Sequence, residues 1–282
     1  MIALCPNPFR DIGLELTLKV AKLLKEGGFD TVICPVYSDD ASDVLPEWIE
    51  YTELSLIEDS CSLAVVIGGD GTILSVVRTL GGGKLPVLGV NLGTKGFMTA
   101  LEPEECELIL NAAKGEYRIS RRMMIDIKLV RNGEVIYFDR ALNDAVVHGY
   151  GDCVNLTAWC NGDKITSFSG DGIILATPTG STGYSMSAGG PIVEPDAENI
   201  ILSPICAHVM GMRSFVLSPE RTVVIRAEKQ HSRKAYLSID GNWATDLENG
   251  DELVVTKSPE YTIMANMGLR SFYEIAYDKL TR

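Results

Sequence analysis

The stretch Val65-Val66-Ile67-Gly68-Gly69-Asp70-Gly71-Thr72 decides the fold of the first part of this chain. The apolar run from Leu63 to Ile67 is typical of a strand that is covered on both faces in a parallel sheet. Glycines follow it, and a helix is predicted from about Thr72 to Leu80. A strand that enters a helix through a tight glycine turn predicts one unit of a doubly wound α/β domain, with the turn at the ligand-binding edge.

The residues on either side of this stretch extend the same pattern. Short apolar runs predict further strands at 2–5, 31–34 and 86–90. Between the first two, apolar residues recur at helical spacing from Asp11 to Glu26, and Gly27-Gly28 ends that helix. The alternation of strands and helices predicts an α/β phosphate-loop domain over residues 1–118.

Near residue 120 the periodicity changes. Ile125, Ile127 and Leu129 alternate with polar residues, which is the period of a half-buried strand. Asn-Gly pairs predict two-residue hairpin turns at 132–133, 161–162 and 249–250. We predict a mostly antiparallel β-sandwich domain over residues 119–262. Apolar residues in the segment 263–282 predict that it packs back on the first domain.

Charge and cysteine content narrow the class of protein. The 282 residues carry a formal net charge of -13. This negative charge disfavours the binding of nucleic acids and of anionic membranes, but it is compatible with the binding of a small nucleotide. The seven cysteines include no C-x-x-C pair, which argues against a zinc site or a disulfide framework. With no signal peptide and no long apolar run, we expect a soluble, cytoplasmic protein that binds neither nucleic acid nor membrane.

The glycine turn has the chemistry of a phosphate site. Glycines let the backbone approach phosphate oxygens, and the following helix offers free N–H groups. Beside phosphates, Asp70 can hold Mg²⁺ or accept the proton of an attacking hydroxyl. The alternative is a tight turn in which Asp70 merely caps the helix. The Walker A and G-x-G-x-x-G spacings are both absent from this turn.

A second polar segment follows the apolar strand predicted at 173–176. Residues 177–191 contain six Ser or Thr hydroxyls, a tyrosine and several glycines. Hydroxyls and exposed amides suit ribose and adenine edges, which form hydrogen bonds without charge. A flexible linker is the alternative, and the prolines and the lack of Lys and Glu argue against it.

These motifs together resemble one family. The Gly68 to Thr72 loop is similar to the GGDGT signature of NAD kinases, diacylglycerol-type lipid kinases and, more loosely, phosphofructokinases. Residues 170–195, GDGIILATPTGSTGYSMSAGGPIVEP, resemble the long motif of NAD kinases, and Ala141 to Gly149 resemble their short Asn-Glu motif. The resemblance is to bacterial NAD kinases over almost the whole chain. Asp144 departs from the pattern, because glutamate is usual there.

The resemblance implies a role for each motif residue. Asp70 would be the base or orienting group for the adenosine 2′-hydroxyl of NAD, Asn143 would bind the adenine edge, and Asp144 would bind a ribose diol. The phosphate cradle would comprise Gly68, Gly69, Gly71 and Thr72. The remaining dinucleotide contacts would come from Asp171, Thr182, Gly183, Tyr184 and Ser187, with Asp240 near the same cleft.

The resemblance also implies the reaction and its partners. ATP would donate its γ-phosphate to NAD, giving NADP, with Mg²⁺ or another divalent cation held mainly through the ATP phosphates and no protein ligand firmly assigned. A homo-oligomer, dimer or tetramer, and an active site in the cleft between the two domains are expected. Two alternatives remain open at this point, a lipid kinase that shares the GGDGT loop and a non-catalytic NAD-binding sensor.

Overall fold

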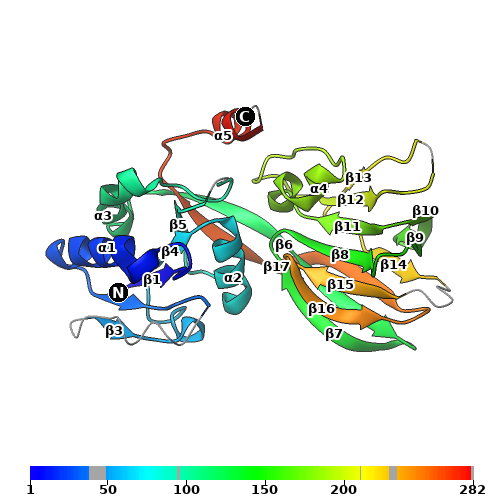
Figure 1. The fold of residues 1–282 in the computed structure, drawn as a ribbon, viewed down its shortest axis with the longest axis horizontal. Coiled ribbons are helices and arrows are strands. Elements are labelled where there is room, and N and C mark those ends of the chain that lie inside the picture. Colours follow the sequence, from blue (N-terminus) through cyan, green and yellow to red (C-terminus); the bar gives the residue numbers. More distant parts are fainter. Residues whose placement is uncertain (38–48, 94–95, 210, 229–233, 281–282) are drawn as a thin grey trace. The chain divides into compact units, whose positions relative to one another are not determined.

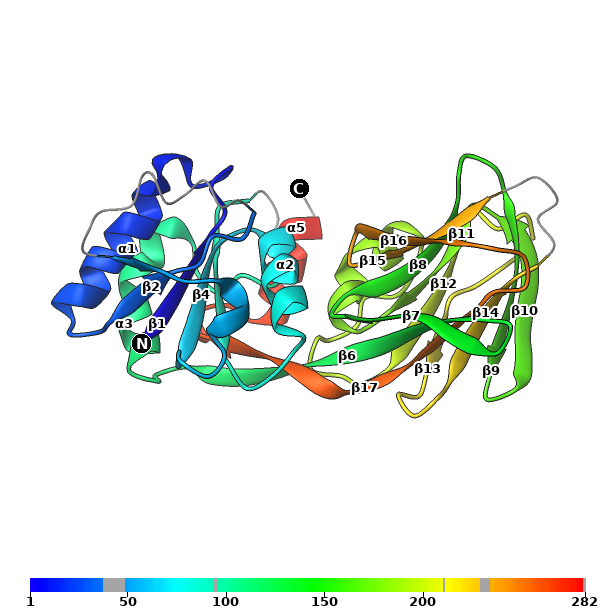
Figure 2. The ribbon, with the colours of Figure 1, turned by 90° about the horizontal axis from the view of Figure 1, so that it is seen from below.

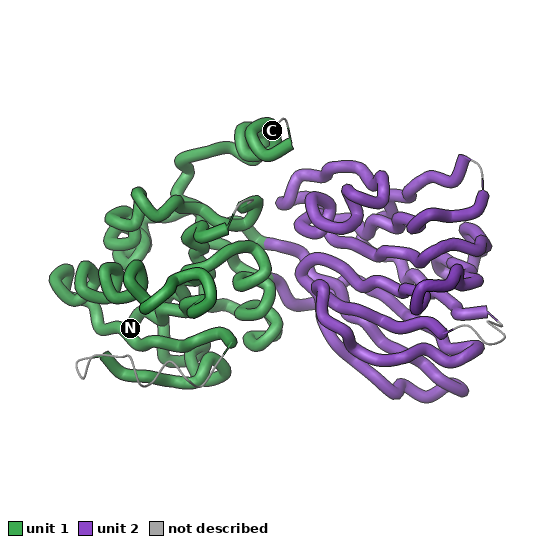
Figure 3. Tube along the Cα trace, in the orientation of Figure 1, with its two compact units in different colours: residues 1–121, 262–282 green, residues 122–261 purple. Residues whose placement is uncertain are grey.

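The computed structural model of the chain describes residues 1–37, 49–93, 96–209, 211–228 and 234–280. The chain divides into two compact units (Figure 3). Unit 1 comprises Met1–Arg121 and Thr262–Arg282, and unit 2 comprises Arg122–Tyr261. The long strand β17 (Glu252–Asn266) therefore begins in unit 2 and ends in unit 1.

Unit 1 is built on a parallel sheet with the strand order β3-β2-β1-β4-β5. Its strands are β1 (Ile2–Pro6), β2 (Thr31–Ile33), β3 (Glu50–Tyr51), β4 (Leu63–Gly68) and β5 (Val87–Asn91). The end of β17 pairs in parallel with β5. β1, β4 and β5 are buried along their whole length, as expected of strands covered on both faces.

Helices cover both faces of this sheet. α1 (Glu15–Glu26) and α3 (Ile109–Ala113) lie on one face, and α2 (Asp70–Leu80) lies on the other (Figures 1 and 2). Three-residue 3₁₀ turns at Ile12–Leu14 and Leu54–Leu56, a longer one at Pro103–Leu108, and the C-terminal helix α5 (Phe272–Leu280) complete the unit. The doubly wound α/β prediction is confirmed.

The predicted helix limits were wrong at two places. α1 begins at Glu15 and not at Asp11, because the Asp11 carboxylate accepts the backbone N–H groups of Leu16 and Thr17 at 3.0 and 2.9 Å from outside the helix. α2 begins at Asp70, two residues earlier than predicted, because the preceding glycine already serves as its N-cap.

Unit 2 consists of two sheets in which every strand pair of known register is antiparallel. The first sheet contains part of β17 and the strands β6 (Arg118–Arg131), β7 (Glu134–Ala141), β9 (Val154–Cys160), β10 (Asp163–Gly170) and β14 (Val223–Ala227). Its strand order is β10-β9-β14-β17, and β6 pairs with both β17 and β7. The second sheet contains the strands β8 (Asp144–Gly149), β11 (Gly172–Ala176), β12 (Ile200–Ile205), β13 (Phe215–Leu217), β15 (Ala235–Ile239) and β16 (Asn242–Leu247). Its strand order is β13-β12-β11-β8-β15-β16.

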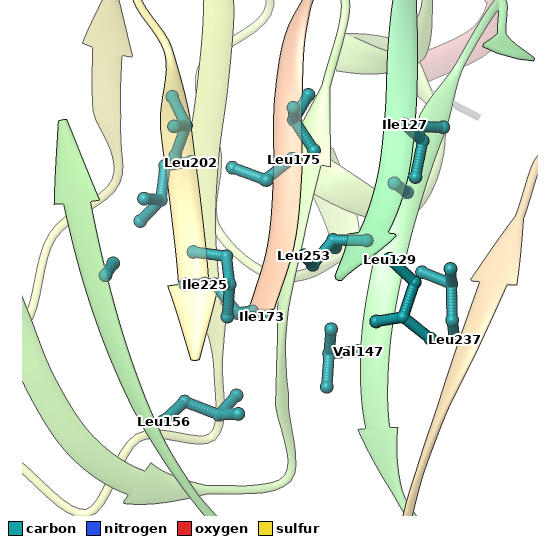
Figure 4. Close-up of a cluster of buried hydrophobic side chains, with 14 of the residues drawn as sticks. Ile127, Leu129, Val147, Leu156, Ile173, Leu175, Leu202, Ile225, Leu237 and Leu253 are labelled. Atoms are coloured by element: carbon teal, nitrogen blue, oxygen red, sulfur yellow. The ribbon is translucent and has the colours of Figure 1, made fainter. Parts of the chain in front are cut away.

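The core of unit 2 is formed by alternate residues of both sheets. Leu175 and Leu202 from the second sheet belong to the same buried cluster as Ile127, Ile225 and Leu253 from the first (Figure 4). The intervening residues of β11 and β12 form a smaller cluster on the opposite face of the second sheet. The segment after β11, which contains the short helices η5 (Thr179–Thr182) and α4 (Tyr184–Ser187), packs on that face. The predicted antiparallel β fold of this part is confirmed.

The Asn-Gly turns were predicted with mixed success. Asn132-Gly133 and Asn161-Gly162 both have positive φ angles, as a two-residue hairpin turn requires, and these two predictions are confirmed. Asn249-Gly250 is not a hairpin turn, because β16 and β17 belong to different sheets. It lies in a connection between sheets, where Glu248 N–H donates to the Asp251 carboxylate at 2.8 Å. Among the described helices, none is long and apolar enough to cross a membrane.

Candidate active site

The strand order of unit 1 creates a topological switch point between β1 and β4. The chain passes from β1 to β2 and β3 on one side, whereas β4 and β5 extend the sheet on the other. In open α/β sheets, ligands bind outside the carboxyl ends of the strands at such a point. β1 ends at Pro6 and β4 ends at Gly68, so the turns that start with Asn7 and Gly69 lie at the binding edge.

The three glycines of the loop serve different purposes. Gly68 is buried, and a Cβ atom there would collide with the side chain of Thr72, so glycine is needed for packing. Gly69 is the N-cap of α2, and a Cβ on it would lie 3.8 Å from Gly93 Cα. Gly71 is exposed and has open space around its Cα. The accessible backbone for a phosphate is therefore at Gly69 and Gly71, at the positive end of α2.

Thr72 differs from its predicted role in the phosphate cradle. Its side chain is buried, and its hydroxyl accepts hydrogen bonds from Asn7 Nδ2 at 3.0 Å and from Gly69 N–H at 3.4 Å. Its own N–H donates to Gly69 O at 2.9 Å. Thr72 therefore closes the turn and links it to β1. Asn7 was missed as a site residue, although its position in a Pro-Asn-Pro turn directly after a strand was a usable signal.

Asp70 is held by a distant segment of the chain. Its carboxylate accepts the backbone N–H groups of Phe97 at 2.9 Å and Met98 at 3.1 Å. The N-cap of α2 is Gly69 and no side chain caps the helix, so the alternative in which Asp70 serves as a helix cap is wrong. The half-buried carboxylate is fixed at the helix N-terminus beside the open glycine backbone. A fixed acceptor next to a phosphate site suits a group that orients or deprotonates a hydroxyl.

Asp240, a predicted NAD contact, is engaged by the backbone of unit 2. It is buried at a two-residue turn between β15 and β16, where Asp240 and Gly241 have φ angles of 47° and 79°. Its carboxylate accepts the backbone N–H groups of Leu142 at 2.9 Å, Asn143 at 2.7 Å and Asp144 at 3.0 Å. Both oxygens are therefore engaged within the protein, where Asp240 shapes the backbone of the Asn143-Asp144 motif.

Asn143 and Asp144 present polar groups that remain available. Among the described residues, Asn143 Oδ1 is one of three buried side-chain atoms without a hydrogen-bond partner, and Thr179 Oγ1 is another. Burial, and to a smaller extent the nearby Asp240 carboxylate, together raise the pKa of Asp144 to about 7. Close to neutral pH, Asp144 therefore exists in part as a protonated acid, which both donates and accepts hydrogen bonds.

The hydroxyl-rich segment was predicted to face a ligand, and for three of its hydroxyls this is wrong. These side chains are buried and hydrogen-bonded within the protein, and they belong to Thr177, Ser181 and Ser185. Ser181 Oγ, for example, exchanges hydrogen bonds with the backbone of Val193 at 3.0 and 3.2 Å. Since this segment crosses an apolar sheet face with little regular structure, the Thr177 and Ser181 hydroxyls satisfy backbone groups.

The predicted dinucleotide contacts of this segment are on its accessible side. Thr182 and Gly183 are half-buried, whereas Tyr184 and Ser187 are exposed. The Tyr184 ring stacks on His148 with centroids 5.6 Å apart, and His148 stacks on Tyr236 at 5.0 Å. Burial lowers the pKa of His148, so its ring is neutral at physiological pH. Neither His148 nor Tyr236 was a predicted site residue, because only sheet pairing brings them beside Tyr184.

Comparison with known proteins gives the family. The N-terminal domain model of ATP-NAD kinase matches residues 7–117, and its C-terminal domain model matches residues 120–267. An NAD kinase of Natranaerobius thermophilus is 32% identical over 283 residues, covering 99% of this chain and 97% of the relative. An NAD kinase of Geobacter metallireducens is 39% identical over 227 residues, which are 79% of this chain and 80% of the relative.

The chain belongs to the NAD kinase family. Its reaction is the ATP-dependent phosphorylation of NAD to NADP. The fold agrees with that of a yeast NADH kinase complexed with NADH, at a TM-score of 0.88 and 24% identity, with 99% of this chain and 87% of the yeast chain covered. Because both domain models match, the family relation rests on the whole chain and not on the GGDGT loop alone, which a lipid kinase would share.

Asp171, the remaining predicted NAD contact, lies in a small cluster with two cysteines and a histidine. It is exposed between β10 and β11, and Cys153 Sγ lies 3.9 Å from its Oδ1 atom and 3.6 Å from His208 Nε2. A hydrogen bond to Asp171 raises the pKa of the Cys206 thiol. His208 itself is exposed beside Cys153.

The residues that the structure describes contain no group of three or more His, Cys, Asp or Glu side chains arranged to hold a metal ion. For an NAD kinase site this means that Asp70 is not part of a carboxylate cage.

Proposed function

We propose that Asp70 is the base that prepares the adenosine 2′-hydroxyl of NAD for phosphorylation by ATP. The single observation that carries this proposal is the carboxylate of Asp70, fixed by the N–H groups of Phe97 and Met98 beside the open backbone of Gly69 and Gly71. The helix N-terminus attracts the phosphates, and the glycines admit them close to the backbone. The base and the phosphate site therefore occur on one rigid turn.

In this reaction the protein does little covalent chemistry. Asp70 accepts the proton of the 2′-hydroxyl while that oxygen attacks the γ-phosphorus in line, the bond to the bridging oxygen breaks, and ADP leaves. Phosphoryl transfer depends mainly on such positioning and on neutralisation of charge. Because a ribose hydroxyl is a weak acid, a placed carboxylate is expected to contribute roughly 10²–10⁴-fold to the rate.

Unit 2 supplies the proposed contacts to NAD. The Asn143 amide pairs with the adenine edge, which offers a donor and an acceptor side by side. The unpartnered Asn143 Oδ1 atom supports this role, since it lacks a donor that adenine would provide. Asp144 binds a ribose diol; its carboxyl is one methylene shorter than the usual glutamate. Further contacts come from accessible residues, namely Asp171, Thr182, Gly183, Tyr184 and Ser187.

We propose that a divalent cation accompanies ATP. The described residues fit a cation bound through the triphosphate better than one bound by a protein cage, since the Asp70 oxygens already accept two backbone N–H groups. When bound, such a cation would neutralise charge on the phosphates. Asp70 is the carboxylate of this turn and would be the protein group to meet the water shell of the cation.

The remaining proposals concern the setting of the enzyme. A homo-oligomer is proposed by analogy with the family, and unit 2 offers exposed apolar side chains such as Tyr150, Val216 and Trp243 for subunit contacts. A cytoplasmic location is proposed because the cysteines are free thiols, three of them fully buried, which suits a reducing compartment.

The test is the formation of NADP from NAD and Mg-ATP by the purified chain and by the variant Asp70→Asn. Asparagine has the same shape and cannot accept the proton, so kcat is expected to fall by about 10²–10⁴-fold while NAD binding is retained. Asp59→Asn, at an exposed position of the same unit, is the matched control and should behave as the wild type. Wild-type turnover in the Asp70 variant would contradict the assignment. A wild-type chain that binds NAD without forming NADP would instead be a sensor.

A further inference from the structure

The backbone of residues 142–144 is held from two sides by Asp240 and Thr177. We propose that these two residues are positioning residues for NAD recognition, which fix the orientation of the Asn143 amide and the Asp144 carboxyl without touching the dinucleotide. The inference rests on the proposed function, because it concerns how the acceptor site of that same reaction is organised. Below, residues 142–144 are called the recognition segment.

Asp240 holds the N–H groups of the recognition segment. Three consecutive N–H groups, those of Leu142, Asn143 and Asp144, converge on its two oxygens at 2.7 to 3.0 Å. The N–H of Asp240 donates in return to Asp144 O at 3.0 Å. Hydrogen bonds to an ionised carboxylate are about twice as strong as neutral ones, so this set of contacts is a firm restraint on the backbone.

Thr177 holds the carbonyl groups of the same segment. Its hydroxyl donates to Leu142 O, and its N–H donates to Asn143 O at 2.8 Å. The same hydroxyl accepts the N–H of Gly180 at 3.1 Å, which ties the following loop to the contact. Gly180 lies so close to Asn143 that a Cβ atom would collide with the Asn143 carbonyl group. The backbone of the recognition segment is thus fixed on both its donor and its acceptor side.

The side chains that this arrangement fixes point to a ligand. The backbone groups of Asn143 are fully used inside the protein, yet its Oδ1 atom is buried and has no partner among the described residues. Thr179 Oγ1, in the loop that packs on the segment, is also buried without a partner. A buried acceptor that lacks a donor is destabilising, and an adenine amino group would supply that donor. The strict backbone fixation therefore serves recognition as well as folding.

Asp240→Asn is the decisive variant. Asp240 has a φ angle of 47° and precedes Gly241, and Asn-Gly is the pair most favoured in such a turn, so the hairpin is retained. The amide replaces one oxygen by an NH₂ group, which cannot accept the N–H groups of the recognition segment. We expect the KM for NAD to rise by about ten-fold, while kcat and the KM for ATP stay close to wild type.

The matched control exchanges the same two residue types at another hairpin of unit 2. Asn132 has a φ angle of 54° and precedes Gly133, so Asn132→Asp keeps the turn and should leave the KM for NAD unchanged. On the carbonyl side, Thr177→Val removes the hydroxyl at constant shape and should also raise the KM for NAD. Thr177→Ser restores the hydroxyl and should restore the KM.

The outcomes separate the possible explanations. Faster hydrogen exchange of the amides in the recognition segment together with a raised KM for NAD supports the proposal. An unchanged KM for NAD in Asp240→Asn and Thr177→Val overturns it. Parallel losses in Tm, kcat and both KM values also overturn it, because they show a general structural role. Failure of the wild-type chain to form NADP would refute the proposed function itself. If the wild type is active and the Asp240→Asn and Thr177→Val variants have its KM for NAD, only the positioning role is refuted.

Discussion

Asp70 and Asp240 are both aspartates at glycine turns, yet their hydrogen bonds give them different roles. Asp70 accepts two N–H groups and lies beside exposed backbone, so its carboxylate can meet a ligand. Asp240 is buried and accepts three N–H groups, so its carboxylate is used inside the protein. At the scale of a residue, the number of backbone donors and the exposure of the carboxylate decide its function.

Asp144 gives the protein a pH-dependent stability. Its pKa is about 7 in the folded chain and close to 3.8 when unfolded, so between these values the folded state retains a proton that the unfolded state loses. The free energy of unfolding is therefore expected to decrease as the pH rises from about 4 to about 7. Asp144→Asn removes this dependence, and its stability relative to wild type should increase with pH over that range.

Urea unfolding of both proteins at several pH values measures this effect. Asp163→Asn, at an exposed position of β10, is a suitable control that should keep the wild-type pH dependence. If wild type and Asp144→Asn show parallel stability curves, the carboxyl of Asp144 is not the group responsible.

At the scale of the element, the junction between β4 and α2 depends on the absence of one methyl group. In Gly68→Ala the new Cβ would meet the Thr72 side chain, which must move and release both Asn7 and the helix N-cap contact. We expect the free energy of unfolding to fall by about 1–3 kcal/mol, as is common for overpacked sites. Gly71→Ala has open space and serves as the control for stability. Equal unfolding midpoints in urea for Gly68→Ala and wild type would contradict this account.

The loops of unit 2 show why composition alone misleads about an element. Residues 177–191 are rich in hydroxyls because this segment crosses the apolar face of the second sheet without pairing to a strand. Its backbone N–H and C=O groups therefore need hydrogen-bond partners from its own side chains. The Thr177 hydroxyl, for example, accepts the backbone N–H of Gly180 at 3.1 Å. Only the subset of polar residues on the outer side of this segment remains available for a ligand.

At the scale of the whole molecule, each unit has its own hydrophobic core. Leu88 is fully buried in the core of unit 1, and Leu175 is fully buried in the core of unit 2. Truncation of either leucine to alanine is expected to cost about 2–5 kcal/mol. Because the cores are separate, we expect the loss of amide protection in hydrogen exchange to be concentrated in the unit that carries the substitution. Equal loss throughout the chain for both variants would contradict this expectation.

Much of the fold was predictable from local sequence. Short apolar runs bounded by turn residues predicted the strands of unit 1, since hydrophobic periodicity and turn residues act over a few positions. Asn132-Gly133 was read correctly because its neighbours pair with each other. Asn249-Gly250 was misread because the same dipeptide joins strands of two different sheets, and no local signal distinguishes the two cases.

The glycine turn, the position of Asp70 and the polar motif around Asn143 were recognisable without a structure, because they depend on residue type and on spacing within a few residues. The tertiary structure decided which groups are free to act. Phe97 contacts Asp70 although the two are 27 positions apart in the sequence, and Asp240 contacts Asn143 although these are 97 positions apart. The physical reason is that a polar group's role depends on the donors and acceptors around it, and those are brought together only when the sheets form.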